Sequence, residues 1–346
     1  MSVSIHALPQ VELPEVVQVA TGIRSIRLPL PFALNHINVW VLDDRTADGQ
    51  PAWAVVDTGV SSRLCRSLWE GLLEGPLADR HVSRVVVTHF HPDHIGLADW
   101  LCQRFGAPLW MSQAEWLLAR MLHLDKSESF AEAEREFYAS MALDPAMLAG
   151  LVERVHAYSR AVPGVPARHR RLQGGKQVRI GDTDWQIITS GGHSPEHACL
   201  YDPADRVLIA GDMVLPRISP NVSVWPADPE SDPLAEFLDG LSRLRTLPQD
   251  TLVLPSHGHP FRDLHGRIDE LVRHHQERLN EAEAACRDQP RTVADITRLM
   301  FHRPLDVHQM TFAAGEALAH LNHLVNTGRV TRSRRDDGVL LFAATR

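Results

Sequence analysis

The sequence predicts an α/β fold in which buried strands alternate with amphipathic helices. Residues 85–88 are β-branched and read as a buried strand, residues 97–105 have helical spacing and end at Gly106, and residues 108–111 read as a short strand. This strand–helix–strand alternation is typical of a sheet covered by helices. Several predicted strands also end in histidine or aspartate, which places the polar chemistry at strand ends.

The composition is that of an ordinary globular protein. The 346 residues, 44% hydrophobic and 23% charged, suffice for one large domain or a large and a small one. The net charge of −8 argues against attraction of the whole surface to nucleic acid, although it leaves room for a local basic patch. No segment approaches the ~20 apolar residues of a membrane span, and residues 1–15 lack a secretory signal pattern. We expect a cytoplasmic protein with no membrane contact and four reduced thiols, at Cys65, Cys102, Cys199 and Cys286.

The N-terminal part is predicted to supply three strands and a helix. Residues 22–28 and 37–42 read as two strands joined by a proline-containing turn. Residues 53–56 give a third strand, which runs into Asp57-Thr58-Gly59, and residues 62–73 have the spacing of a helix. These elements lead directly to the strand at residues 85–88.

The densest polar cluster follows that strand and reads His89-Phe90-His91-Pro92-Asp93-His94. His89 and His91 alternate at the strand end and can share one face, whereas Asp93 and His94 follow on a tight turn. Three imidazoles and a carboxylate within six residues suit a divalent ion such as zinc, manganese or iron. A histidine-rich surface loop is the alternative, but the order of the residues and their position after a strand favour a metal site.

This His-x-His-x-Asp-His motif resembles that of the metallo-β-lactamase superfamily. The resemblance implies a four-layer αββα sandwich, in which helices flank two mixed sheets and the metal ligands lie on loops at one edge. It also implies a carboxylate that orients the ligand loop from beneath, and Asp57 matches that position. A simple Asx turn is the local alternative for Asp57.

Three further strand ends carry residues that the family uses as ligands. His193 is flanked by glycine and followed by Ser-Pro, as is the third ligand of the family's first metal. Asp212, after an apolar strand and a glycine, resembles the bridging aspartate. His257 resembles the last ligand of the second metal, although Ser256 stands where the family usually has glycine.

The resemblance therefore implies two divalent ions, zinc by preference with manganese or iron as alternatives. Their ligands would be His89, His91 and His193 for the first ion and Asp93, His94 and His257 for the second, with Asp212 touching both. Two adjacent cations lower the pKa of a bridging water, so the site is expected to use a bridging hydroxide. Asp93, which can orient that water or take its proton, and Asp212 are the catalytic candidates. We interpret His197 as structural and His259 as a rim residue.

Residues 112–158 change in character and are predicted to form two or three helices, an insertion of about residues 112–160 between the metal motifs. An insertion there would lie over the site as a lid or a substrate wall. Its methionines and aromatic residues, such as Met141, Phe137 and Tyr138, could line an apolar pocket or simply pack the helices together.

The C-terminal part is predicted to form a separate module. A long helix from Ile268 is followed, beyond Pro290, by three short helices and a hairpin that turns near residues 336–338, the pattern of a winged helix. We therefore divide the chain into a catalytic domain (1–285) and a winged-helix-like domain (286–346). Four arginines on the wing favour DNA binding, but the candidate recognition helix, 311–326, has no Arg or Lys. This favours a structural appendage or a homodimer contact.

The Pro-Arg-Ile-Ser-Pro-Asn run at 216–221 resembles a subgroup typified by human β-lactamase-like protein 2 and fungal metallo-β-lactamase-type thioesterases. We expect a dinuclear hydrolase that acts on a small acyl substrate, a thioester, ester or lactone. A metal-dependent endoribonuclease is the alternative, with the arginines at 168–171 and on the wing as the only dense basic clusters. A non-enzymatic, ligand-responsive regulator is the third reading.

Overall fold

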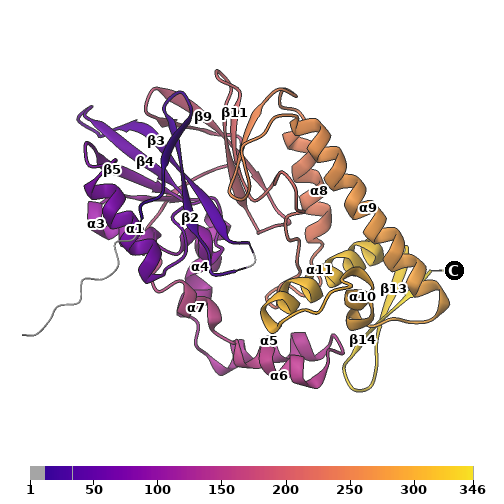
Figure 1. The fold of residues 1–346 in the computed structure, drawn as a ribbon. Coiled ribbons are helices and arrows are strands. Elements are labelled where there is room, and N and C mark those ends of the chain that lie inside the picture. Colours follow the sequence, from indigo (N-terminus) through magenta and orange to yellow (C-terminus); the bar gives the residue numbers. More distant parts are fainter. Residues whose placement is uncertain (1–11, 33, 346) are drawn as a thin grey trace, which may run out of the picture.

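The computed structural model describes residues 12–32 and 34–345, so most of the segment tested for a secretory signal lies outside the described residues. Two sheets lie against each other in the body of the molecule (Figure 1). The first sheet has the strand order of the chain itself and comprises β1 (Val16–Ala20), β2 (Ile23–Pro29), β3 (His36–Arg45), β4 (Pro51–Val56), β5 (His81–Val86), β6 (Leu109–Met111) and β7 (Arg170–Arg171).

The second sheet runs in the order β12-β11-β10-β9-β8. Its strands are β8 (Gln177–Ile180), β9 (Thr183–Ser190), β10 (His197–Asp202), β11 (Val207–Gly211) and β12 (Leu252–Pro255). Both sheets are mixed: β4 to β7 pair in parallel after four antiparallel strands, and β11 pairs in parallel with β12 in an otherwise antiparallel sheet. The prediction of two mixed sheets is therefore confirmed.

Helices cover the outer faces of both sheets. One apolar cluster joins the facing sides of the sheets and includes Trp40 of β3 and Trp185 of β9. A second packs the first sheet against α1 (Arg63–Glu74) and α3 (Ala98–Phe105). A third packs the second sheet against α8 (Pro233–Leu244) and α9 (Leu264–Asp288). The layers therefore follow the order helix, sheet, sheet, helix.

The strand before the histidine cluster ends at Val86 and not at Thr88 as predicted. Sequence reasoning extended it because the β-branched run continues to Thr88. In the structure the backbone N–H of Thr88 donates to a carboxylate oxygen of Asp57, 2.9 Å away, and not to a neighbouring strand. At Thr88, the hydrogen bond to a neighbouring strand is thus replaced by one to a side chain, at the point where the metal motif begins.

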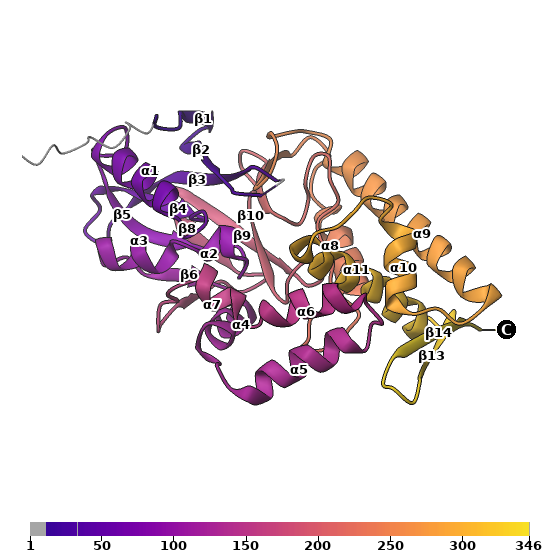
Figure 2. The same ribbon diagram turned by 60° about the horizontal axis from the view of Figure 1, so that its bottom comes forward.

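The predicted helical insertion is present, and it spans two parts of the molecule (Figure 2). Its helices are α4 (Gln113–Leu124), α5 (Glu128–Ala139), α6 (Pro145–Glu153) and α7 (Ala157–Ala161). α4 joins the core of the first sheet, whereas α5 and α6 join the core of the C-terminal segment. At Gly150 the approach to α11 is so close that a Cβ atom would lie 2.7 Å from Val307 Cγ2. Phe137, Tyr138 and Met141 are buried in this packing.

The C-terminal segment has two helices beyond Pro290, not the predicted three. They are α10 (Val293–Met300) and α11 (Val307–Asn326), and the hairpin of β13 (Val330–Arg334) and β14 (Leu340–Ala344) follows. α9 takes the place of the predicted third helix, because it packs against α10, α11 and β14. Within the described part of the chain, no helix is long and apolar enough to cross a bilayer.

One prediction follows from the third apolar cluster, which is continuous from the second sheet to the C-terminal hairpin. Phe342→Ala removes a fully buried ring from it and should cost about 3–5 kcal/mol of unfolding free energy. Because the core is shared, we expect one unfolding transition at a lower temperature in calorimetry of the full chain. Leu341→Ala, on the other face of the same strand, is the control; a separate early transition for the C-terminal segment would contradict the shared core.

Candidate metal centre

All the predicted ligands lie together at one edge of the two sheets. They lie on the loops after β5, β9, β11 and β12, except Asp93 and His94, which lie in the short helix α2 (Pro92–Ile95). In the first group, His89 Nε2 lies 2.9 Å from His91 Nδ1 and 3.1 Å from His193 Nε2. Two nitrogens bound to one tetrahedral zinc at ~2.0–2.1 Å are about 3.3 Å apart. The three imidazoles therefore have nearly the spacing that a single ion requires.

The second group consists of Asp93, His94 and His257, and Asp212 faces both groups. His257 Nε2 is 3.4 Å from Asp93 Oδ2 and 3.4 Å from Asp212 Oδ2. Asp212 Oδ2 also lies 3.5 Å from His193 Nε2, and its Oδ1 lies 3.6 Å from His94 Nε2. The carboxylate of Asp212 therefore lies near a histidine of each group.

The donor atoms fit a pair of divalent ions. His94 Nε2 and Asp212 Oδ1 are buried and have no hydrogen-bond partner among residues 12–32 and 34–345. Such orphaned polar atoms are rare in folded proteins because burying them unpaired costs free energy. Imidazole and carboxylate donors are those that zinc, manganese and iron accept.

Two of the imidazoles, those of His193 and His257, are oriented by a bond from the other ring nitrogen to a backbone carbonyl. His193 Nδ1 lies 2.7 Å from the carbonyl oxygen of Asn221, and His257 Nδ1 lies 2.7 Å from that of His36. A carbonyl only accepts, so both Nδ1 atoms carry the proton and both Nε2 atoms turn a lone pair toward the centre. This arrangement is the one that metal-bound histidines usually have.

Asp57 holds the ring of His94 from beneath, as its position in the sequence suggested. Its Oδ2 lies 2.8 Å from His94 Nδ1, and its Oδ1 accepts from the backbone N–H of Thr88. The residue is fully buried and has a φ of 61°, in the left-handed region that aspartate tolerates better than most residues. The backbone bend therefore aims the carboxylate at the histidine loop.

The pKa values of the imidazoles follow their surroundings. Burial, with the neighbouring His193, lowers the pKa of His91 to about 3, and burial also lowers the pKa of His89 and His193, so these rings are neutral. Burial opposes charge on His257 too, yet Asp212 and Asp93 raise its pKa to about 10. The carboxylate side of the site thus favours positive charge, which a divalent cation supplies.

Sequence reasoning missed Glu115, the residue that joins two ligand loops. Glu115 comes from α4 and is fully buried. Its Oε2 accepts from the backbone N–H of Phe90, 2.9 Å away, and its Oε1 accepts from that of Glu196, 2.7 Å away. Burial raises the pKa of Glu115 to about 7, although these donors favour the charged form. No motif marks this residue; only its place in an otherwise amphipathic helix distinguishes it.

The two histidines interpreted as non-ligands lie outside the groups of potential ligands. His197 Nε2 accepts from the backbone N–H of Asp212, 3.1 Å away, so His197 holds the backbone of this residue. His259 is exposed. Both therefore have the secondary places that the sequence suggested.

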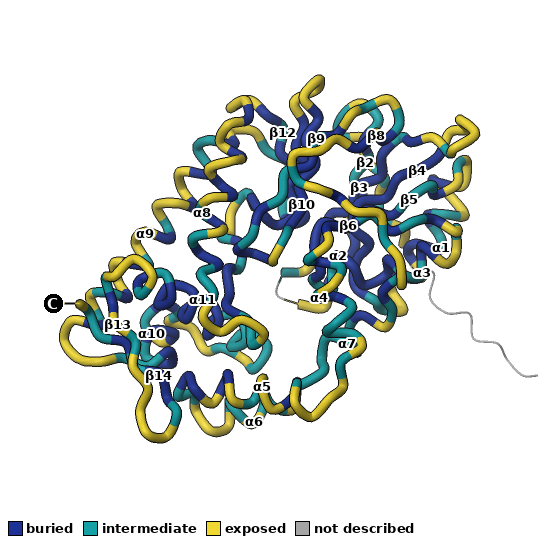
Figure 3. Tube along the Cα trace, turned by 180° about the vertical axis from the view of Figure 1, so that it is seen from behind, coloured by how far each residue is buried: buried dark blue, intermediate teal, exposed yellow. Residues whose placement is uncertain are grey.

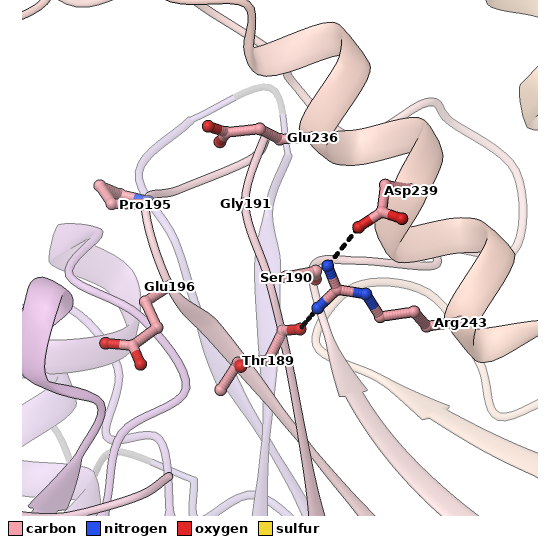
Figure 4. A pocket seen from close by; sticks show the side chains of 8 residues that line it. All are labelled: Thr189, Ser190, Gly191, Pro195, Glu196, Glu236, Asp239 and Arg243. Atoms are coloured by element: carbon pink, nitrogen blue, oxygen red, sulfur yellow. Dashed lines mark hydrogen bonds and ion pairs between the residues drawn. The ribbon is translucent and has the colours of Figure 1, made fainter. Parts of the chain in front are cut away.

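A surface depression of about 290 Å³ lies beside the His193 loop (Figure 4). The guanidinium of Arg243 in its wall is already paired, with Asp239 and with the carbonyl oxygen of Thr189. None of the predicted ligands lines this depression or a larger one beside Asp250 and Arg262. Neither is the reaction site.

Comparisons with known proteins agree with this geometry. Residues 34–257 match the family model described as "Metallo-beta-lactamase superfamily". Residues 279–345 match the model described as "Metallo-beta-lactamase-like, C-terminal domain". Together, the two matches take in all of the predicted ligands and most of the C-terminal segment.

Two solved structures resemble the whole chain. A beta-lactamase domain protein from Burkholderia ambifaria is 47% identical, with a TM-score of 0.88 over 96% of this chain and 96% of that chain. A metallo-beta-lactamase family protein from Thermus thermophilus is 28% identical, with a TM-score of 0.77 over 95% of this chain and 100% of that chain.

Curated relatives are more distant. The probable metallo-hydrolase YqjP of Bacillus subtilis is 21% identical over 87% of this chain and 91% of its own length. A beta-lactamase-like protein 2 homolog of Caenorhabditis elegans is 21% identical over 90% and 83%, respectively. A hydroxyacylglutathione hydrolase of Hydrogenovibrio crunogenus is 22% identical over 65% and 60%.

Glu115→Gln should weaken metal binding without unfolding the protein. Glutamine has one acceptor oxygen for two backbone N–H groups, so one ligand loop loses its anchor. Loss of such supporting bonds usually costs 10–100-fold in metal affinity, roughly the effect expected here. Competition with a chromophoric chelator measures it, with exposed Glu132→Gln as the control. Equal affinities in the two variants would exclude the anchoring role.

Proposed function

Since the chain belongs to the metallo-beta-lactamase superfamily and is a metal-dependent hydrolase, we propose that it cleaves an acyl bond, a thioester or ester by preference, in a small organic substrate. The observation that carries the proposal is the group of aromatic rings beside the donor atoms. In addition, most of the arginines in the two basic clusters are paired. The metals are proposed to be two zinc ions, held by the ligands described above.

One wall of the proposed substrate site is aromatic. The rings of Phe90 and Trp225 lie 4.6 Å and 6.1 Å from the ring of His91, measured between centroids. Tyr158, from α7 of the insertion, packs 5.8 Å from Phe90 and donates its hydroxyl to the Phe90 carbonyl oxygen. An acyl group can bury apolar surface against such a wall.

We propose that the C-terminal segment contributes a second wall. His308 of α11 packs 5.3 Å from Phe32, on the loop that leads to β3, and 5.0 Å from Phe312. The guanidinium of Arg154, from the insertion, donates to His308 Nδ1 at 3.0 Å. Burial and Arg154 lower the pKa of His308, against the effects of Asp306 and Asp93. We therefore place the substrate between the aromatic wall and α11.

The basic clusters that would favour an RNA substrate are largely neutralised. On the hairpin, Arg329 pairs with Glu283, Arg332 with Glu230 and Arg335 with Asp337. In the segment at 168–171, Arg171 pairs with Glu196, and Arg170 lies over the ring of Trp110. Polyanions gain most of their affinity from cations free to contact phosphates, so these arginines favour the acyl reading.

We propose that residues 286–346 form a winged-helix-like module with a structural role. Most of α11 from Ala313 to Leu324 is buried against its neighbours, which leaves little of it to enter a DNA groove (Figure 3). The match at residues 279–345 supports a module beginning near this point. The likeness to the beta-lactamase-like protein 2 homolog supports the proposed subgroup and keeps single-stranded RNA among the substrates to be tested.

Two adjacent divalent cations, when bound, polarise a carbonyl oxygen and acidify a water molecule. We propose that Asp93, whose Oδ2 lies 3.4 Å from His257 Nε2, accepts the proton of the attacking water. Asp212 would link the two groups of donors, because its Oδ2 lies near His193 and its Oδ1 lies near His94. The relative named as a hydroxyacylglutathione hydrolase supports a thioester as the substrate class, since acylglutathiones are thioesters.

Rates on a panel of substrates test the reaction. Zinc-loaded protein should hydrolyse acyl thioesters or esters with a kcat/KM at least tenfold above that for single-stranded RNA or phosphodiesters. Trp225→Ala should raise KM for longer acyl chains more than for acetyl, because the lost wall contacts only the chain. RNA cleavage faster than every acyl reaction, and abolished in His91→Ala, would reverse the assignment.

Metal content tests the bridging role. Asp212→Ala should lose at least one metal equivalent and most of the activity, because both groups of donors lose an oxygen. Elemental analysis after dialysis against trace zinc measures the ratio, with exposed Asp336→Ala as the control. Equal metal content in wild type and Asp212→Ala would rule out a bridge.

A further inference from the structure

We infer that a second, separate metal site lies between α9 and α11, held by His274, His275 and Glu316. A donor atom from each of the three residues lies within 4.8 Å of the others. α9 and α11 run side by side in the C-terminal part of the molecule, and this group shares no residue with the centre described above (Figure 1).

A chain of hydrogen bonds leaves one nitrogen of His275 free to bind an ion. His320 Nδ1 lies 2.8 Å from the carbonyl oxygen of Glu316, which can only accept, so this nitrogen carries the proton. In the neutral ring, His320 Nε2 then accepts from His275 Nδ1, 3.2 Å away. The remaining nitrogen, His275 Nε2, bears a lone pair, and it is buried without a partner among the described residues.

This pattern is the one expected of a metal-bound histidine, whose other nitrogen donates to a fixed acceptor. His275 is fully buried, and burial with the nearby His320 lowers its pKa to about 2. The ring is therefore neutral, as a ligand must be. His320 acts here as the partner that orients His275.

Glu316 supplies the negative charge of the group. Its side chain is nine-tenths buried, and it forms no hydrogen bond or ion pair within 12–32 and 34–345. Arg278, whose charge acts on Glu316, forms its ion pair with Glu281. Burial raises the pKa of Glu316 to about 7, against the effect of Arg278. An unpaired carboxylate is costly in such surroundings, and a bound cation would offset that cost.

The donor chemistry indicates the kind of ion. Two imidazoles and one carboxylate suit zinc or a similar divalent transition metal, with water completing the shell. His274 is only half-buried and gives the ion a route from solvent. Bound there, the ion would join α11 to the helix that leaves the catalytic layers.

Zinc content tests the site in the full-length protein. Glu316→Gln keeps the shape of the side chain and removes its charge, and it should bind one zinc equivalent fewer than the wild type after dialysis against micromolar zinc. Hydrolysis should stay within twofold of the wild type, because the other centre is intact. Exposed Glu277→Gln, on α9, removes the same charge and should keep the full zinc content.

Two further variants keep the test decisive if Glu316→Gln folds poorly. His274→Ala removes the half-buried ligand and should also lose one equivalent, while His320→Phe should weaken binding of that equivalent about 10–100-fold without abolishing it. Equal zinc content in wild type, Glu316→Gln and His274→Ala would overturn the inference and leave a hydrated polar cluster between two helices.

Discussion

The centre depends on one buried carboxylate. Asp57 holds the backbone of Thr88 with one oxygen and the ring of His94 with the other, so a single side chain stops the strand β5 and orients a ligand. Because both oxygens are used, the ring cannot turn without losing a bond. His89 and His91 follow Thr88 directly, and their positions depend on the same anchor.

The other ligands are held by elements that are distant in sequence. The carbonyl oxygens of Asn221 and His36 orient His193 and His257, and Glu115 ties the Phe90 loop to the Glu196 loop. The donors follow strands of both sheets, whereas their supports come from loops, from the first residue of β3 and from the insertion. The geometry of the centre is therefore a property of the packed sandwich and not of the motif alone.

Sequence reasoning found what is local. The strands and the histidine-rich cluster after β5 follow from apolar runs that end in histidine or aspartate, a pattern that a short stretch of chain can carry. The two mixed sheets and the full set of ligands were implied by the resemblance to the metallo-β-lactamase superfamily. Sequence reasoning missed Glu115 and the carbonyls of Asn221 and His36, because a backbone acceptor has no residue type and a lone glutamate in a helix looks solvated. It also extended β5 to Thr88 and expected a third short helix, since neither a side-chain bond nor the packing of α9 is visible in propensity.

The insertion and the C-terminal segment share one apolar core. This arrangement constrains how the sequences of the two segments can change in evolution. α6 touches α11 at Gly150 with no space for a side chain, and Ala294 donates its backbone N–H to Met141. A change of substrate through a new insertion would require a matching new C-terminal segment. Natural variation in substrate choice should therefore appear as paired changes in these two regions, far from any metal donor.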